Sequence, residues 1–152
     1  MKIAICGSLA FTYEMKSLAG GLQKIGIEAF IPITSERIIR GELSLEEIKE
    51  EKAKGKPSDR KIKYDAMRAY CDVIKNCDGI LVANYDKNGI ENYIGGNAFL
   101  EMGFAHVTHK KIYLLNDIPD MIYRDEIEAM QPIILHGDLL ALKQGPSRMF
   151  QQ

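Results

Sequence analysis

The sequence contains no tryptophan, and it has no long run of hydrophobic residues. No apolar stretch approaches the ~20 residues that a membrane-spanning helix needs, which argues against a membrane protein. The apolar part of residues 1–8 is too short for a signal peptide and predicts a first strand instead. The formal net charge is −1. Nothing at the level of the whole chain therefore attracts a nucleic acid polymer or an anionic membrane.

Cysteine and histidine are also scarce. Cys6, Cys71 and Cys77 form no CxxC pair and stand in apolar or helical surroundings, which predicts reduced, buried thiols in a cytoplasmic protein. His106 and His109 are three residues apart on a predicted helix, but no carboxylate or cysteine joins them in the local pattern. We therefore expect no metal site.

What the chain does contain is an alternation of strand and helix signals over residues 1–143, followed by a loose tail at 144–152. The length of 152 residues suits one domain. The predicted strands are residues 2–6, 27–33, 79–85, 111–116 and 132–136. This alternation predicts a three-layer α/β fold, flavodoxin-like or Rossmann-like, with a five-stranded parallel sheet in the order 2-1-3-4-5 and helices on both faces.

Residues 35–63 interrupt the alternation with a segment rich in charges of both signs. Ser44 and Glu47 form a capping box for a short polar helix, which Gly55 and the residues after it end. The segment is predicted to be either a solvated insertion or a lid over a binding site.

The segment from Asn84 to His106 is the most informative part of the chain. It follows a buried strand with a polar loop and then enters a helix through Gly95 and Gly96. Two glycines at a helix start let the backbone approach a phosphate or a ribose, although they also suit a simple tight turn. In a doubly wound sheet, ligands bind at the carboxyl ends of the strands near the point where the strand order reverses. Residues 7–8, which follow the first strand, are expected at the same crevice.

One acid, Glu101, lies just inside that helix. Its neighbours one turn away are small, apolar or amide residues: Asn97, Ala98, Phe104 and Ala105. None of them is a basic partner. The helix dipole favours the charged form of Glu101, whereas burial opposes it. Such a carboxylate suits attack on an electron-poor carbon, as in glycosidic bond cleavage, and the alternative is a glutamate that caps loop amides or points into solvent.

Amide and aromatic side chains recur in the same segment. Amides offer both a donor and an acceptor, so they suit base edges and sugar hydroxyls, but they also suit turns. Aromatic rings can stack on a base or form the rim of a pocket. The residues are Asn84, Asn88, Asn92, Asn97, Tyr85 and Tyr93.

Two stretches, residues 78–82 (Asp-Gly-Ile-Leu-Val) and 96–105 (Gly-Asn-Ala-Phe-Leu-Glu-Met-Gly-Phe-Ala), resemble the nucleoside 2-deoxyribosyltransferase superfamily. That superfamily also includes the 2'-deoxynucleoside 5'-monophosphate N-glycosidases. Its hallmark is a glutamate followed by x-Gly-x-Ala, which here reads from Glu101 to Ala105. The opening residues 3–8 and the order of the elements match as well, so the similarity spans most of the chain.

The resemblance implies a flavodoxin-like fold and nucleophilic attack by Glu101 on the sugar C1', with a glycosyl-enzyme resolved by water or by a second base. It implies a small-molecule nucleoside or nucleotide as partner, no metal or redox cofactor, and assembly as a homodimer or a higher homo-oligomer. The residues expected to bind the substrate are Gly7, Ser8, Asn84, Tyr85, Asn88, Tyr93, Gly95, Gly96 and Asn97.

Two positions depart from the family pattern. Six positions before the nucleophile, transferases usually carry an aspartate and monophosphate hydrolases a serine, whereas this chain has Gly95. An acid after the third strand often orients the sugar or base, and here the residue is Asn84. The expected function is N-glycosidase or 2-deoxyribosyltransferase, and the alternative is a non-catalytic nucleotide-binding or sensing module on the same fold. The absence of a Ser/Thr-rich phosphate loop after the first strand argues against a flavodoxin-like electron carrier.

Overall fold

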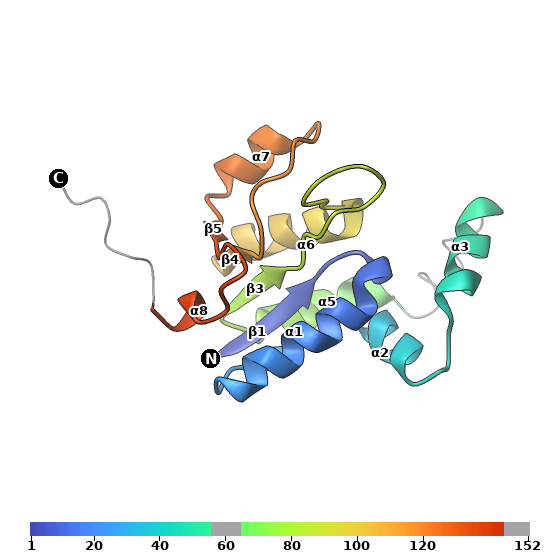
Figure 1. Cartoon of the computed structure of the whole chain (residues 1–152), viewed down its shortest axis with the longest axis horizontal. Helices are drawn as coiled ribbons and strands as arrows, with labels where there is room; N and C mark the ends of the chain where they lie inside the picture. Colours follow the sequence, from blue (N-terminus) through green and yellow to red (C-terminus); the bar gives the residue numbers. More distant parts are fainter. Residues whose placement is uncertain (56–64, 145–152) are drawn as a thin grey trace.

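The computed structural model describes residues 1–55 and 65–144, which form a parallel sheet flanked by helices (Figure 1). The sheet has five strands in the order β2-β1-β3-β4-β5, with every neighbouring pair parallel. This order confirms the topology predicted from the sequence. The strands are β1 (Lys2–Cys6), β2 (Glu28–Phe30), β3 (Gly79–Val82), β4 (Lys111–Leu114) and β5 (Ile133–Ile134).

Helices connect the strands, as right-handed crossovers between parallel strands require. A short 3-10 turn, η1 (Leu9–Phe11), leads from β1 into the first long helix. The α-helices of the described residues are α1 (Thr12–Lys24), α2 (Ile33–Ile39), α3 (Leu45–Ala53), α5 (Ala66–Lys75), α6 (Gly96–Val107), α7 (Arg124–Ala129) and α8 (Ala141–Gln144). None of these helices combines the length and the apolar character needed to cross a bilayer.

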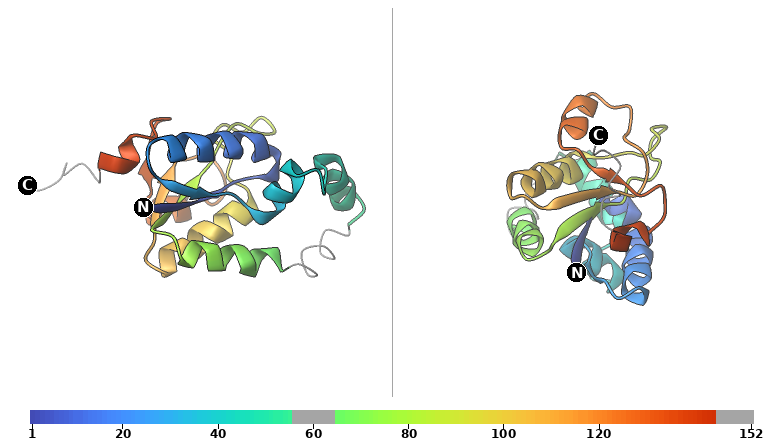
Figure 2. Two further views of the ribbon diagram at one scale, coloured as in Figure 1. Left: turned by 90° about the horizontal axis from the view of Figure 1, so that it is seen from below. Right: turned by 90° about the vertical axis from the view of Figure 1, so that its left-hand side faces the viewer.

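Two apolar cores lie on opposite faces of the sheet. Met15 and Leu22 of α1 pack on one face together with α8, while Met102 and Ala105 of α6 pack on the other together with α5 and α7. The left view of Figure 2 shows α1 on one side of the sheet and α5 and α6 on the other. Every residue of β3 is buried, because helices cover both faces of this central strand.

The strand order reverses between β1 and β3, and their register brings the two strand ends together. Cys6 pairs with Val82, so the residues that follow each strand emerge at the same edge of the sheet. The connection after β1 turns toward β2 and the connection after β3 turns toward β4, which opens a crevice between them.

The polar segment predicted at residues 35–63 begins later than expected. The strand β2 ends at Phe30, and Pro32 is the N-cap residue of α2, in which Thr34, Ser35 and Ile38 are buried. The Ser35 hydroxyl lies 2.9 Å from that of Thr12 on α1, so α2 belongs to the body of the domain. Residues 56–63 of the segment and 145–152 of the predicted tail lie outside the described residues.

The helix predicted after Ser44 is confirmed as α3. Ser44 Oγ accepts a hydrogen bond from Glu47 N, and Glu47 Oε2 accepts one from Ser44 N, both at 3.1 Å, which completes the capping box. α3 stands beyond the carboxyl ends of the strands (Figure 1). Its side chains can therefore reach the crevice from outside the sheet.

Candidate active site

Glu101 lies in the second turn of α6 and brings a carboxylate into the interior of the domain. Its Oε2 atom is buried and has no hydrogen-bond partner among the described residues. Most buried polar atoms in native proteins are paired, and leaving one unpaired costs about 1–3 kcal/mol. An oxygen kept in this state is available to a ligand.

Burial decides the electrostatics of Glu101. Desolvation raises the pKa of its carboxyl to about 7, while a hydrogen bond with the Cys6 thiol acts in the opposite direction. Burial, one of the two opposing effects expected from the sequence, is the largest influence on this pKa. The pKa of Cys6 is itself raised well above its usual value, first by burial and then by Glu101. Cys6 therefore stays a protonated thiol at neutral pH, and its Sγ lies 4.0 Å from the Ala4 carbonyl oxygen.

A small cavity of about 60 Å³ opens at Glu101, and we call it the glutamate cavity. It lies beneath the segments that follow β1 and β2 and against the start of α5. Its walls are mainly apolar, which excludes water from the carboxylate and strengthens any charge interaction there. They are formed by Gly7, Leu9, Pro32, Ile33, Thr34, Ala66, Met67 and Asn97 together with Glu101.

A second cavity of about 90 Å³, the lysine cavity, adjoins the first. The two share Gly7, Leu9 and Asn97, so they are two ends of one cleft. The lysine cavity is lined in addition by Ser8, Lys52, Lys87, Tyr93, Gly95, Gly96 and Ala98. The cleft therefore has a carboxylate at one end and two ammonium groups at the other.

Gly7 lines both cavities, and its position leaves little room for a side chain. A Cβ atom there would lie 3.2 Å from the Met15 sulfur and 3.3 Å from Cβ and the carbonyl oxygen of Ala83. The backbone leaving β1 consequently passes close to α1 and to the end of β3.

The loop of residues 85–93 is an ordered hairpin that carries Lys87 to the cleft. Lys87 and Ile90 exchange two backbone hydrogen bonds of 3.0 Å around Asn88 and Gly89. Both central residues have positive φ, as a type I′ turn requires. At the base of the loop, the Tyr93 amide donates to the Tyr85 carbonyl at 2.9 Å.

Lys87 is held in place by two contacts. Its Nζ donates a hydrogen bond of 2.9 Å to Ser8 Oγ, and it lies 5.1 Å from the centre of the Tyr93 ring, within the range of a cation–π contact. Ser8 Oγ also accepts from the Ala10 amide at 3.3 Å. The contact with Ser8 joins the loop after β3 to the loop after β1.

The start of α6 is also fixed. Ile94 is buried, and its carbonyl accepts a hydrogen bond from the Tyr123 hydroxyl. The Tyr123 ring stacks on Phe99, with 4.4 Å between the ring centres. The first turn of α6 is thereby anchored to the segment before α7.

The structure brings most of the predicted site residues together and leaves three outside the cleft. Gly7, Ser8, Tyr93, Gly95, Gly96 and Asn97 line it with Glu101. Tyr85 instead packs edge-on against Phe11, with 5.3 Å between ring centres, as part of the core beside α1. Asn88 is an exposed turn residue.

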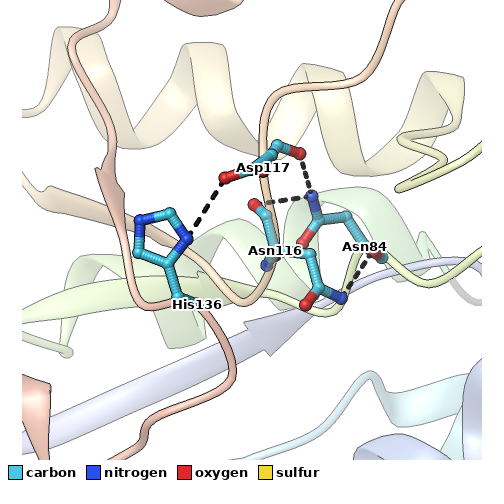
Figure 3. Close-up of polar contacts among 4 residues, drawn as sticks. All are labelled: Asn84, Asn116, Asp117 and His136. Atoms are coloured by element: carbon cyan, nitrogen blue, oxygen red, sulfur yellow. Dashed lines mark hydrogen bonds and ion pairs between the residues drawn. The ribbon is translucent and has the colours of Figure 1, made fainter.

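Asn84 is the third of these residues, and its side chain forms hydrogen bonds within the protein instead of facing the cleft. It is completely buried. Its Nδ2 donates to the carbonyl oxygens of Asn116 at 3.1 Å and Asp117 at 2.9 Å, and its Oδ1 accepts from the Asn116 amide at 2.9 Å. Figure 3 shows this cluster with Asp117, which also lies 3.3 Å from His136. Asn84 therefore ties the loop after β3 to the loop after β4.

The two lysines that line the cleft, Lys52 and Lys87, were not assigned from the sequence, and neither was Cys6, which is buried and influences the Glu101 carboxyl. The predicted position of Cys6 at the end of the first strand was a usable signal, because this strand lies beside the one that leads to Glu101. Lys52 had no comparable signal, since nothing in the sequence indicates which lysines of α3 lie beside the cleft.

A larger hollow, of about 660 Å³, lies elsewhere on the described surface. It is bounded by residues 89–92 and 117–120 and by Arg124. Arg124 already pairs with Glu128 at 2.9 Å and donates to the Ile118 carbonyl at 3.1 Å. No buried, unpaired side-chain atom faces this hollow within the described residues. We therefore place the site at the smaller cleft.

Comparisons with protein-family models, with curated proteins and with solved structures found no match to this chain.

Proposed function

We propose that the protein cleaves the N-glycosidic bond of a nucleoside or a nucleoside 5'-monophosphate, as an N-glycosidase or a 2-deoxyribosyltransferase, with Glu101 as the nucleophile. The observation that carries the proposal is the buried carboxylate oxygen of Glu101, which faces a cleft and has no partner among the described residues. A protein that only binds its ligand gains little from holding a desolvated acid in this way.

The chemistry follows from the position of this carboxylate. Glu101 attacks C1' of the sugar while the C1'–N bond breaks, and the bonding electron pair leaves with the base, which takes up a proton. The sugar becomes an ester of Glu101, formed through an oxocarbenium-like transition state that the carboxylate stabilises. Water or a second base then attacks C1' and releases Glu101, so the configuration at C1' is retained.

The neighbours of Glu101 suit this reaction. Asn97 lies one turn before Glu101 on α6 and lines both cavities, which places an amide between the two ends of the cleft. Such an amide can donate to and accept from the sugar hydroxyls. Burial raises the pKa of the carboxyl to about 7 and the Cys6 thiol acts against this increase, so a substantial fraction of Glu101 is ionised and nucleophilic at neutral pH.

The proposal is tested by free-base release. Purified protein is incubated with a panel of nucleosides and 5'-monophosphates, with and without an acceptor base, and the products are separated by chromatography. We expect wild type to release a base and Glu101→Gln to lose at least about 1000-fold of this activity while remaining folded. Glu126→Gln, which changes an exposed glutamate of α7, is the matched control and should retain activity.

Each outcome has a clear meaning. Retained turnover in Glu101→Gln would exclude Glu101 as the nucleophile. If wild type released no base across the panel and yet was stabilised by an intact nucleotide, the result would favour the non-catalytic binding module. Formation of a new nucleoside with the acceptor base would identify a transferase.

A further inference from the structure

We propose that Thr34 is a substrate-binding residue that recognises the hydroxyl group on the sugar carbon next to C1', so that the protein prefers ribose to 2'-deoxyribose. This inference rests on the function proposed above and deepens it, because it favours N-glycosidase action on a ribonucleoside or its monophosphate over transfer of a 2-deoxyribosyl group. Thr34 was not assigned to the site from the sequence, and it lines the same cavity as Glu101.

Thr34 is buried but lacks the hydrogen bonds that the other buried polar side chains make. Four polar residues of the described chain are buried: Thr12, Thr34, Ser35 and Asn84. The Thr12 and Ser35 hydroxyls lie 2.9 Å apart, and Asn84 binds the backbone of the loop after β4. The Thr34 hydroxyl has no hydrogen-bond partner among the described residues, although Thr34 is only 8% exposed. Since burying a hydroxyl without a partner costs free energy, this group is kept available for a ligand.

The glutamate cavity gives this hydroxyl its access to a ligand. Glu101 Oε2 is the one fully enclosed side-chain atom without a partner in the parts of the chain that the structure describes. The Thr34 hydroxyl, which also has no partner, is therefore not fully enclosed, and the space that Thr34 borders is the glutamate cavity. This cavity of about 60 Å³ thus presents two unsatisfied polar groups, one from α2 and one from α6, within walls that are mainly apolar.

The position of Thr34 is fixed by the residues around it. Ser35, the next residue of α2, is fully buried, and its hydroxyl lies 2.9 Å from that of Thr12, which in turn donates to the Leu9 carbonyl at 2.6 Å. Ile38, one turn further along α2, is buried as well. α2 therefore cannot carry Thr34 away from the cavity without breaking these contacts, and a group held in this way loses little freedom when it binds a ligand.

The stereochemistry of the proposed reaction decides which part of the substrate meets Thr34. In a β-nucleoside the base projects from one face of the furanose ring, and the 2'- and 3'-hydroxyls of ribose project from the other. A nucleophile that displaces the base attacks C1' from the face opposite the base, so Glu101 approaches on the face that carries these hydroxyls. The 2'-hydroxyl, on the carbon bonded to C1', consequently enters the cavity that contains the carboxylate.

A 2'-hydroxyl satisfies both groups that are unpaired in the free protein. It can accept a hydrogen bond from the Thr34 hydroxyl and donate one to Glu101 Oε2, which leaves the other carboxylate oxygen for C1'. Hydrogen bonds to this hydroxyl also strengthen in the transition state of retaining glycosidases. A 2'-deoxy sugar offers only a CH₂ group at this position. A site built to bind a hydroxyl discriminates against a ligand that lacks it, because its own polar groups then stay unpaired.

The test measures binding, not turnover. Calorimetric titrations use the Glu101→Gln protein, in which the ligands stay intact and the glutamine keeps a hydrogen-bonding group beside Thr34. Each common base is offered on ribose, 2'-deoxyribose and 3'-deoxyribose, as the nucleoside and as the 5'-monophosphate. For the preferred base, we expect the ribose ligand to bind at least about 10-fold more tightly than the 2'-deoxy ligand and within about 3-fold of the 3'-deoxy ligand.

Variants of Thr34 on the same background localise the effect. Thr34→Val keeps the shape of the side chain and removes the hydroxyl, so it should weaken binding of the ribose ligand at least about 10-fold and leave that of the 2'-deoxy ligand nearly unchanged. Thr34→Ser keeps the hydroxyl and should retain most of the preference. Thr108→Val is the matched control. It removes a hydroxyl that donates to the Phe104 carbonyl at 2.7 Å at the far end of α6, and it should alter neither affinity.

Equal affinities for the ribose and 2'-deoxyribose ligands in the Glu101→Gln protein would overturn the proposal. A preference for ribose that persists in Thr34→Val, or one that depends on the 3'-hydroxyl instead, would overturn it as well. Because binding requires no turnover, the two proposals can fail separately. A preference for ribose that Thr34→Val abolishes, in a protein whose wild type releases no base, would sustain the role of Thr34 while contradicting the N-glycosidase proposal. Base release by wild type at equal rates from ribose and 2'-deoxyribose substrates would do the reverse.

Discussion

Glu101 is held in surroundings that oppose its charge, and this has a measurable consequence for stability. Burial raises the pKa of its carboxyl from 4.5 to about 7. Below pH 4.5 the acid is protonated in both the folded and the unfolded chain and contributes no pH dependence. As the pH rises through 7, the unfolded chain is already ionised, and the folded protein must bear a desolvated charge. The group therefore destabilises the fold increasingly between pH 4.5 and about 7, and the effect levels off above pH 7, where the acid is ionised in both states.

We expect Glu101→Gln to remove this pH dependence, because glutamine is neutral throughout. The free energy of unfolding of the variant relative to wild type should rise by roughly 2–3 kcal/mol between pH 5 and pH 8. Urea denaturation at a series of pH values measures the difference. A constant difference across this range would show that Glu101 titrates near its ordinary pKa and would contradict the burial argument.

Gly95 stands where the nucleoside 2-deoxyribosyltransferase superfamily usually has an aspartate or a serine. The packing around Gly95 explains why this chain has no side chain there. A Cβ atom at this position would lie 3.1 Å from Tyr93 Cε1 and 3.2 Å from its hydroxyl oxygen. The Tyr93 ring occupies the space into which an aspartate or a serine would project. The Gly95 φ of −81° is ordinary, so the restriction comes from Tyr93 and not from the backbone.

Two adjacent glycines provide a matched test of this explanation. Gly95→Ser should displace Tyr93 and cost about 1 kcal/mol or more of stability. Gly96→Ser should be nearly neutral, because no atom lies within 4 Å of a Cβ there. Replacing Tyr93 by alanine in the Gly95→Ser background should abolish the extra cost, and a double-mutant cycle measures the coupling. Equal effects of the two serines would contradict the explanation.

At the scale of elements, two loops at the carboxyl edge of the sheet are joined by a buried amide. The side chain of Asn84 makes three hydrogen bonds to the backbone of residues 116–117, and Asn116 returns one from its Nδ2 to the Asn84 carbonyl at 3.1 Å. This junction fixes where the 85–93 loop leaves the sheet, and hence where Lys87 can reach.

Asn84→Ala should destabilise the protein by about 2–4 kcal/mol, because it leaves buried backbone groups at residues 116–117 without partners. Asn76→Ala is the control. It removes one exposed hydrogen bond, from Asn76 Nδ2 to the Asp72 carbonyl, and should cost less than about 1 kcal/mol. Chemical denaturation of both variants gives the comparison. A cost for Asn84→Ala no larger than that of the control would show that the junction is not structural.

At the scale of the whole molecule, the fold was predictable because alternating strand and helix signals leave few topologies. Parallel strands need right-handed crossovers, and the five predicted strands fit the doubly wound order that the structure shows. The crevice could also be placed, since it lies where that order reverses. Gly7, Ser8 and the start of α6 were assigned to it for this reason, and the structure brings them together.

Other parts of the site depend on contacts that no local pattern encodes. The sequence pattern around an amide in a polar loop is the same in three different roles. The amide can bind a ligand, form a turn as Asn88 does, or be buried between loops as Asn84 is. The contribution of Lys52 depends on how α3 is placed relative to the sheet. The pKa of Glu101 depends on how completely α2, α5 and the loop after β1 enclose it, which only the packed structure shows.

The 85–93 loop begins and ends at the same place, because the backbone of Tyr93 bonds to that of Tyr85. Its interior could be exchanged for another sequence of similar length without disturbing the strand before it or the helix after it. Glu101 lies outside the 85–93 loop. Descendants of this chain, or engineered versions of it, could therefore acquire new ligand preferences through the loop while inheriting the buried acid unchanged.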